Sequence, residues 1–357
     1  MQKSDGMNYA PTGKARHVVE PGAFPVAAIG LDHGHIYGMM NGLIEAGATP
    51  KWVYDPDEAK VAKFLDAFPQ AKAARSRQEI YDDPDVKLVA AANVPCDRGP
   101  LGCEVMRAGK DYFVDKAPFT TLEQLTEARQ VVAETSKKCS VYYSERLHTE
   151  CSIYAGNLIQ EGAIGRVLQV IGTGPHRLGA AGRPKWFFEK CRYGGILIDI
   201  GSHQIEQFLH FTGAKDARVD SARVANYNNK QTPELEDFGD ATLTADNGAT
   251  NYFRVDWFTP DGLGAWGDGR CFILGTDGYI ELRKYLDIAR DPKSDQLYLV
   301  NHKEEKRIET HGTVGFPFFG ELILDCLNRT ENAMTQEHTF KAAELCLLAQ
   351  QKAVKVE

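Results

Sequence analysis

The fold is decided by the stretch FPVAAIGLDHGH, residues 24–35. Its first seven residues form a short apolar run that ends in Gly30, which is typical of a buried parallel strand. An apolar-periodic segment over 36–46 then predicts a helix. A second strand over 51–54 ends at Asp55. This order of strand, glycine turn, helix, strand and acidic residue predicts a βαβ unit that binds a dinucleotide.

The chemistry of that unit favours NAD as the dinucleotide. The N-terminus of the predicted helix offers unpaired N–H groups and a partial positive charge to a pyrophosphate. Asp55 would accept hydrogen bonds from an adenosine ribose diol and would repel a 2′-phosphate, so we expect NAD rather than NADP. No arginine follows Asp55 directly, which points the same way.

The glycine loop itself departs from the usual G-x-G-x-x-G pattern. Its three positions hold Gly30, Asp32 and His35, with an additional Gly34. An aspartate is unfavourable where the backbone should approach a pyrophosphate, and a loop path in which Gly34 supplies the close approach is one solution. His33 and His35 are either ligand contacts or turn residues.

Strand–helix alternation continues through the first half of the chain. We expect further strands over 86–92, 111–115 and 140–144, and helices over 100–109 and 120–134. This alternation predicts a doubly wound, parallel, Rossmann-like sheet, which binds ligands outside the carboxyl ends of its strands. The predicted cofactor contacts are therefore Gly30, Asp32, His33, Gly34, His35, Asp55, Asn93, Pro95, Asp115 and Lys116.

Lys116 is placed unusually for a lysine. It follows a predicted buried strand directly and precedes Ala117-Pro118. Pro118 disfavours helical geometry at Ala117, and its own peptide bond could be cis. The structural alternative is a salt bridge from Lys116 to Asp115 or Glu145 that closes the strand end. We favour a functional role, because the strand end is where a ligand would bind.

The second half of the chain opens with YGGILIDIGSH, residues 193–203. A helix from about residue 198 would place Asp199 and His203 one turn apart on one face. A carboxylate and an imidazole there could share one substrate hydroxyl, or one could orient the other. The alternative for this segment alone is a glycine turn followed by a core histidine.

A long loop over 175–192 precedes that segment and carries candidate substrate contacts. After residue 213 the hydrophobic period changes to two, which predicts a large, mostly antiparallel sheet of five or more strands. Such a sheet buries only one face easily, so we expect the open face to form a homodimer or homotetramer. The candidate substrate contacts are His176, Arg177, Lys185 and Trp186, with Trp257 and Trp266 as either contacts or core residues.

Composition narrows the class of protein. Lys plus Arg is 41 and Asp plus Glu is 49, giving a formal net charge of −8 in 357 residues, and no basic run is present, so we expect no nucleic-acid partner. No apolar run approaches the ~20 residues of a membrane span. The eight cysteines include no C-x-x-C pair, which is typical of free thiols in the cytoplasm. We expect no metal site.

Three parts are expected along the chain. Residues 1–23 form a polar tail without the apolar core of a secretory signal. Residues 24–147 form the Rossmann-like, dinucleotide-binding domain. Residues 148–357 form an α/β domain with the large open-faced sheet, which binds the substrate and mediates oligomerisation.

Three features together, the Rossmann-like start at Gly30 and two motifs, resemble the Gfo/Idh/MocA family, that of glucose–fructose oxidoreductase and inositol dehydrogenase. Residues 115–118 read DKAP where the family's fifth strand ends in Glu-Lys-Pro, and the family pattern GG-x-x-x-D-x-x-x-H matches residues 194–203 without a gap. The resemblance implies that Lys116 contacts the reacting hydroxyl and the nicotinamide region. It also implies that Asp199 positions the sugar and that His203 is the general acid/base.

We therefore expect an NAD-dependent oxidoreductase that acts on a CH–OH group of a sugar, polyol or related carbohydrate. One alternative is an enzyme that oxidises a glycoside transiently, eliminates the glycosidic bond and recycles NAD. The other is a non-catalytic sensor of NAD or sugar. Net release of NADH separates the first two. Ligand binding, with turnover unchanged when His203 or Lys116 is replaced by alanine, would favour the third.

Overall fold

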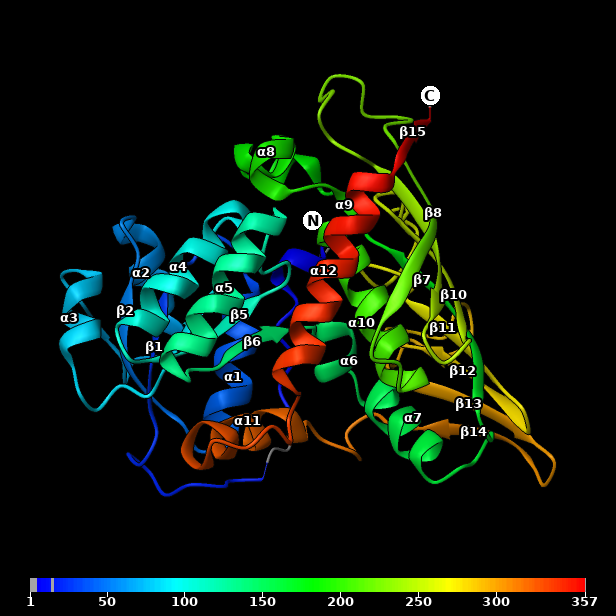
Figure 1. Ribbon diagram of the computed structural model, residues 1–357, viewed down its shortest axis with the longest axis horizontal. Helices are drawn as coiled ribbons and strands as arrows, with labels where there is room; N and C mark the ends of the chain where they lie inside the picture. Colours follow the sequence, from blue (N-terminus) through cyan, green and yellow to red (C-terminus); the bar gives the residue numbers. More distant parts are fainter. Residues whose placement is uncertain (1–4, 14–15, 357) are drawn as a thin grey trace. The chain divides into compact units, whose positions relative to one another are not determined.

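The computed structural model describes residues 5–13 and 16–356, which form two compact units (Figure 1). The first unit consists of residues 7–142 and 315–340. The second unit consists of residues 5–6, 143–314 and 341–356. The chain thus leaves the first unit after Tyr142 and returns to it for residues 315–340.

A six-stranded parallel sheet forms the centre of the first unit. Its strands run in the order β3-β2-β1-β4-β5-β6, and every neighbouring pair is parallel. Every residue of β4 and β5 is buried, as expected for a parallel sheet that is covered on both faces. The predicted doubly wound parallel sheet is confirmed. The strands are β1 (Pro25–Ile29), β2 (Thr49–Tyr54), β3 (Lys72–Ala73), β4 (Leu88–Ala91), β5 (Asp111–Asp115) and β6 (Cys139–Tyr142).

Six α-helices belong to the described part of this unit. The side chain of Asp57 caps α2 and that of Thr121 caps α5. Helix α11 comes from the far end of the chain because its apolar side chains pack on the sheet: the rings of Phe318 and Phe319 lie 5.8 and 6.3 Å from that of Phe113. The helices are α1 (His35–Glu45), α2 (Glu58–Ala67), α3 (Arg77–Asp82), α4 (Pro95–Arg107), α5 (Leu122–Thr135) and α11 (Pro317–Asn328).

Helix α4 starts earlier than the sequence predicts. The polar residues 93–99 were expected to form a loop and a helix was expected over 100–109, but α4 already begins at Pro95. Proline suits the first helical position because its missing N–H would have no partner there. The early start also places Arg98 among the buried residues of the helix.

The second unit is built on a nine-stranded sheet. The strand order is β14-β13-β12-β11-β7-β10-β9-β8-β15. Only β7 with β10 and β8 with β15 are parallel neighbours, so the predicted large and mostly antiparallel sheet is confirmed. The strands are β7 (Val167–Pro175), β8 (Ala217–Ala225), β9 (Phe238–Ala245), β10 (Thr250–Asp256), β11 (Arg270–Gly275), β12 (Gly278–Arg283), β13 (Gln296–Asn301), β14 (Glu305–Glu309) and β15 (Val354–Val356).

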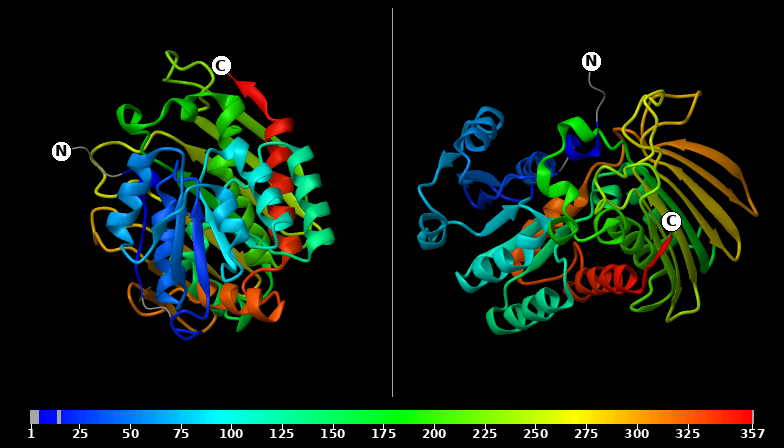
Figure 2. Two further views of the ribbon diagram at one scale, coloured as in Figure 1. Left: turned by 90° about the vertical axis from the view of Figure 1, so that its left-hand side faces the viewer. Right: turned by 90° about the horizontal axis from the view of Figure 1, so that it is seen from above.

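One face of this sheet is covered by helices. Helix α10 packs on β7, β9 and β10 (Figures 1 and 2). Strands β7, β11 and β12 nevertheless expose several large apolar side chains: Ile171, Phe272, Leu274 and Tyr279. The helices are α6 (Ser144–Leu147), α7 (Glu150–Gln160), α8 (Lys190–Tyr193), α9 (Ile196–Asp199), α10 (Gly201–Thr212) and α12 (Gln336–Lys352), of which α12 begins in the first unit.

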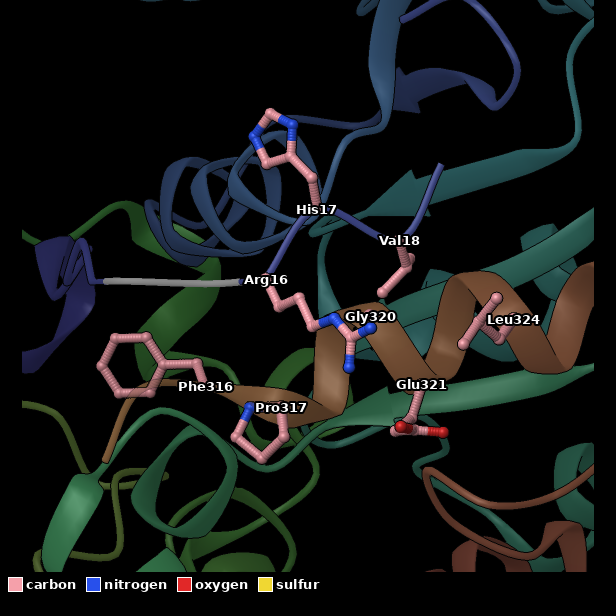
Figure 3. A pocket seen from close by; sticks show the side chains of 8 residues that line it. All are labelled: Arg16, His17, Val18, Phe316, Pro317, Gly320, Glu321 and Leu324. Atoms are coloured by element: carbon pink, nitrogen blue, oxygen red, sulfur yellow. The ribbon is translucent and has the colours of Figure 1, made fainter. Parts of the chain in front are cut away.

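The described part of the predicted polar tail packs on its own chain. The amide of Gly13 donates to the carboxylate of Glu45 at 3.1 Å, and that of Val18 donates to the carbonyl of Ala46 at 3.0 Å. Residues 16–18 and α11 line a cavity of about 420 Å³, into which the Arg16 side chain points (Figure 3). This cavity contains none of the predicted site residues.

Candidate functional site

Gly30 forms the turn at the carboxyl end of β1. Its φ is +78°, and a Cβ there would stand 2.6 Å from the Cβ of Asn93, so only glycine suits the position. Its amide donates to Tyr54 and its carbonyl accepts from Ala92, which joins the turn to the ends of β2 and β4. Asn93 Oδ1 is buried here without a hydrogen-bond partner among the described residues. A buried acceptor beside a glycine turn fits a bound dinucleotide.

Asp55 holds the glycine loop in place. Its two carboxylate oxygens accept from the amides of Leu31 at 2.7 Å and Asp57 at 2.9 Å. Lys60 lies 3.9 Å from Asp55 and only 2.6 Å from Asp32. Two carboxylates and one ammonium group therefore meet at the end of β2, where the sequence analysis places the ribose of the dinucleotide.

Gly34 is the N-cap of α1, and its open side is filled by the protein itself. A Cβ on Gly34 would meet the carbonyl oxygen of Met7 at 2.5 Å and the side chain of Asn8 at 2.8 Å. These residues belong to the 3₁₀ helix η1 (Gly6–Asn8). The close approach at Gly34 is therefore made by the N-terminal segment. Its role as a cofactor contact stays a prediction.

His33, His35 and Asp115 form a buried cluster at the ends of β1 and β5. His35 Nδ1 lies 2.8 Å from one carboxylate oxygen of Asp115, and His33 Nδ1 lies 3.4 Å from the other. Burial, and then His35, hold the pKa of His33 well below its ordinary value. Burial alone would raise the pKa of Asp115, but His35 and then Arg98 outweigh it and lower that pKa.

The ligand atoms of this cluster are close enough to hold a metal ion, since all lie within 4.8 Å of one another. However, the guanidinium of Arg98 already pairs with Asp115 at 3.0 Å. With a divalent cation bound, the ion, Asp115 and Arg98 would together carry a net charge of +2. Burying that charge without further anions is strongly disfavoured. The cluster is better described as an ion pair that the protein has closed.

Arg98 is a residue that the sequence analysis missed. It is 1% exposed and reaches four carbonyl groups as well as Asp115. Arg98 Nε donates to Asn93 O at 2.7 Å, and Nη1 donates to the carbonyls of Asp115, Lys116 and Ala117. Arg98 therefore fixes the backbone of the segment that carries Lys116. The only sequence signal was an arginine in the short segment 93–99.

Lys116 follows β5 directly, as predicted, and is 5% exposed. Of the two carboxylates considered as its structural partners, Asp115 pairs with Arg98 and His35, and Glu145 pairs through one oxygen with Lys284. The peptide bond between Lys116 and Ala117 is cis, so the suggested cis bond before Pro118 is wrong by one position.

The two glycines of the second motif serve the fold. Gly194 and Gly195 have φ of +93° and +118°, and a Cβ on Gly195 would overlap the side chain of Gln350 on α12. Gln350 in turn accepts from the amide of Leu197 at 3.1 Å. The glycine-turn interpretation therefore holds for Gly194 and Gly195.

Asp199 and His203 lie on two consecutive short helices instead of one. α9 ends at Asp199 and α10 begins at Gly201, with Ser202 Oγ donating to the carbonyl of Asp199 at 2.7 Å. Asp199 is half-buried, and its charge acts on Arg183. His203 is 1% exposed, and its ring packs edge-on against Tyr143 with centroids 6.4 Å apart.

A second buried ion pair, which the sequence analysis did not find, is bonded to Gln204, the residue that follows His203. Glu145 accepts from Lys284 Nζ at 2.8 Å and from Gln204 Nε2 at 3.1 Å, both on the same oxygen. Burial would raise the pKa of Glu145, but Lys284, His203 and His176 outweigh it and lower that pKa to about 2. Glu145 and Lys284 are 139 residues apart, so no local pattern announces their contact.

The predicted substrate contacts on the loop after β7 differ in environment. His176 is buried between Trp257 and Trp266, with ring centroids 5.5 and 4.5 Å away. Arg177 is buried and donates to the carbonyls of Pro260 and Leu263. These contacts give Arg177 a structural task, and they leave the His176 ring flanked by two indoles.

Lys185 and Trp186 lie on the 3₁₀ helix η3 (Lys185–Phe188). The Lys185 side chain is 92% exposed and forms an ion pair with Glu189 at 3.4 Å, whereas Trp186 is half-buried. Arg183 is more deeply placed than either, stacked over the rings of Phe187 and Trp257 at 4.5 and 5.0 Å. It was not among the predicted contacts.

Two family profiles match the chain. Residues 28–143 match the oxidoreductase family with an NAD-binding Rossmann fold, GFO_IDH_MocA, and residues 153–281 match the GFO/IDH/MocA C-terminal domain. No helix in the described ranges is both long and apolar enough to cross a membrane.

Individual relatives cover the chain to different extents. A solved structure from Erwinia carotovora atroseptica SCRI1043, named only as an oxidoreductase, is 52% identical with a TM-score of 0.91 and covers 94% of this chain and 100% of that one. The scyllo-inositol 2-dehydrogenase (NAD+) of Bacillus subtilis is 25% identical over 71% of this chain and 72% of its own length. The D-xylose dehydrogenase of Paenarthrobacter nicotinovorans is 25% identical over 41% of this chain and only 39% of its own length.

Proposed function

We propose that this chain, which belongs to the Gfo/Idh/MocA family of NAD(P)-binding oxidoreductases, transfers a hydride between nicotinamide and a hydroxyl-bearing carbon of a sugar, polyol or related carbohydrate. The observation that supports this proposal is that one chain combines a glycine turn at Gly30 with a buried histidine, His203, and that the turn lies beside the buried acceptor of Asn93, which has no partner among the described residues. Two distant relatives that act on xylose and scyllo-inositol support the substrate class.

The dinucleotide would be held at the carboxyl ends of the first sheet, by the turn at Gly30 and by the acceptor of Asn93. When bound, nicotinamide supplies the hydride acceptor for oxidation or the hydride donor for reduction. The other predicted cofactor contacts belong to the same strand ends. The task of the protein there is to orient the dinucleotide and to exclude water.

The proton chemistry belongs to the side chains. During oxidation His203 removes the proton of the substrate hydroxyl, and Lys116 stabilises the alkoxide that develops. The carbinol carbon loses a hydride as the carbonyl forms. The substrate has then lost one proton and one hydride, so the carbonyl product is neutral. Asp199 accepts a hydrogen bond from a neighbouring hydroxyl and positions the ring. His176, between Trp257 and Trp266, is the strongest of the further substrate contacts, and Arg177, Lys185 and Trp186 complete the set.

We propose NAD as the preferred dinucleotide. Asp32 and Asp55 bring two carboxylates to the end of β2, and among the described residues Lys60 is the one cation paired with them. The remaining negative charge disfavours a 2′-phosphate. The free state of all eight described cysteines agrees with a reducing, cytoplasmic location, which we also propose.

A panel of sugars and polyols, monitored for NADH with NAD and with NADP, tests the function. Accumulation of NADH on at least one substrate, and its loss in Lys116→Ala and His203→Ala, is the expected result. Cleavage of a glycoside without net NADH would instead identify the transient-oxidation enzyme. Binding of NAD or sugar without any turnover would identify a sensor, and full activity of both variants would refute the assignment of the two residues.

We further propose that a second copy of the chain covers the open face of the nine-stranded sheet. Ile171 lies opposite Phe272 across β7 and β11, and Leu274 lies opposite Tyr279 across β11 and β12, so these exposed side chains form one continuous apolar patch. The expected assembly is a homodimer or homotetramer. Light scattering would show a smaller assembly for Phe272→Glu, and a monomeric wild type would refute the proposal.

A further inference from the structure

The buried pair Glu145–Lys284 is more elaborate than a stable core requires. Glu145 is 1% exposed and Lys284 is 0% exposed, and their charged atoms lie 2.8 Å apart. Removing two charges from water is costly, and replacing a buried ion pair by apolar side chains of similar size is often neutral or stabilising. Stability alone is therefore a weak reason for this pair, and its surroundings suggest another.

The pair is anchored to the helix that carries His203. Gln204, the next residue on α10, donates to the same oxygen of Glu145 as Lys284 does. Two glycines of β7 make room for this amide: a Cβ on Gly172 would stand 2.2 Å from Gln204 Oε1, and one on Gly174 would stand 2.9 Å from its Nε2. The Gln204 side chain therefore fits against strand β7 only because residues 172 and 174 are glycines, and it reaches Glu145 from there.

The second oxygen of Glu145 is left open. Glu145 Oε1 is buried and has no hydrogen-bond partner among the described residues. The nearest charged neighbour is His176 Nε2 at 3.9 Å, too far for a direct bond, while His176 Nδ1 is engaged with the carbonyl of Gly174 at 3.1 Å. Glu145 therefore has one oxygen held by Lys284 and Gln204 and one open oxygen near His176, and its bond to Gln204 ties it to the residue that follows His203 on α10.

We propose that Glu145 and Lys284 are positioning residues for His203, with the carboxylate favouring the imidazole once it has gained a proton and the ammonium group limiting that effect. The proposal rests on the function assigned to His203 above. It predicts opposite consequences for the two partners. Removing the carboxylate leaves an uncompensated cation near His203, whereas removing the ammonium group leaves an uncompensated anion.

Other charged and titratable groups lie on the elements that carry this pair and His203. On α6 and α10, Arg146 and Glu206 neutralise each other through a buried ion pair of 2.5 Å. Burial raises the pKa of the Cys271 thiol to about 12 and that of the Cys151 thiol well above its usual range, so both stay neutral. Further titratable groups on these elements are His176 on the loop after β7, Asp199 at the end of α9, and Tyr143, whose ring packs against that of His203.

The test is an NMR titration of the histidine side chains in the ligand-free, full-length protein. The His203 signal is identified by its absence in His203→Gln. We expect the His203 midpoint to fall by about one pH unit in Glu145→Gln and to rise by about one unit in Lys284→Met. Glu309→Gln and Lys293→Met, which break an exposed ion pair, are matched controls and should leave the midpoint unchanged.

Two further results decide the proposal. The double variant Glu145→Gln/Lys284→Met removes both charges, so it should return the midpoint to near the wild-type value even where one single variant folds poorly. If the folded variants leave the midpoint unmoved, or move it in the same direction, the proposal is wrong. The titration requires no substrate, so an inactive carbohydrate panel would refute the proposed function without deciding this inference.

Where a substrate is found, the pH dependence of kcat provides the second readout. The rising limb of the pH profile should move with the His203 midpoint, by about one pH unit. It should move to lower pH in Glu145→Gln and to higher pH in Lys284→Met. A purely structural role would lower kcat in both variants without moving the limb.

Discussion

The two units each contain a buried carboxylate with a buried cation and two histidines in its electrostatic surroundings. The two carboxylates differ in how many of their oxygens have a hydrogen-bond partner. In the first unit both oxygens of Asp115 are occupied, one by His35 and the other by Arg98. In the second unit only one oxygen of Glu145 is occupied, by Lys284 and Gln204, and the other is open. The same ingredients can therefore hold a backbone or remain available for proton chemistry.

The closed group is a support for Lys116. Arg98 neutralises Asp115 and donates to the carbonyls on both sides of Lys116. The open group is bonded to Gln204, the residue that follows His203. In this account the first unit uses its buried charges to fix a residue in place, and the second unit uses its buried charges to tune one.

The largest effect on stability is expected when the cation of the Asp115–Arg98 pair is removed. Arg98→Met would leave Asp115 buried without its cation and several carbonyls without a donor, which should cost about 3–5 kcal/mol of unfolding free energy. Chemical denaturation measures this loss. Arg107→Met is the matched control, since Arg107 and Glu127 form an exposed pair and its loss should cost under about 1 kcal/mol. Equal losses in the two variants would contradict the distinction.

Acid should weaken both groups. The folded pKa of Glu145, about 2, lies below its ordinary value of 4.5, so the unfolded state binds more protons between those values and stability falls as pH falls through that window. The loss is on the order of 3 kcal/mol. Asp115 acts in the same direction, and so does His33 below about pH 6.5, because its folded pKa is also lowered. Melting temperatures between pH 7 and pH 2 measure the slope.

Glu145→Gln sharpens that measurement. The variant should be less stable at neutral pH, because Lys284 loses its partner, but its stability should depend less on pH below 4.5. An unchanged acid slope in Glu145→Gln would show that the native carboxylate is not the group that titrates.

A smaller effect is expected at the end of β2, where Asp32 pairs with Lys60. Asp32→Ala removes one carboxylate and frees an ammonium group for a 2′-phosphate. The ratio of kcat/KM for NADP over NAD should rise about tenfold, or ~1.4 kcal/mol. A ratio that does not change would show that these two side chains do not face the ribose.

The fold could be predicted because its signals are local. Buried runs such as 24–30 and alternating runs after residue 213 identify a parallel and an antiparallel sheet without knowledge of their neighbours. The start of α4 could not be placed, because Pro95 is compatible with both a loop and a first helical turn.

The candidate site was predicted in part for the same reason. Lys116 and His203 stand in short motifs that can be recognised from adjacent residues. Arg98, Glu145 and Lys284 depend on partners 17 to 139 residues away, and each lies in a segment whose local pattern suggests only a loop or strand end. Burial of a charge is a tertiary property, and the sequence order does not display it.

The most direct measurement of the central claim uses a substrate from the carbohydrate panel with deuterium at the carbinol carbon. Mass spectrometry of the reduced dinucleotide follows the label. Hydride transfer predicts that one deuterium moves from that carbon to the nicotinamide ring, that the rate falls in His203→Gln, and that no label reaches water. Loss of the deuterium to solvent, or turnover that leaves the dinucleotide unlabelled, would contradict the account.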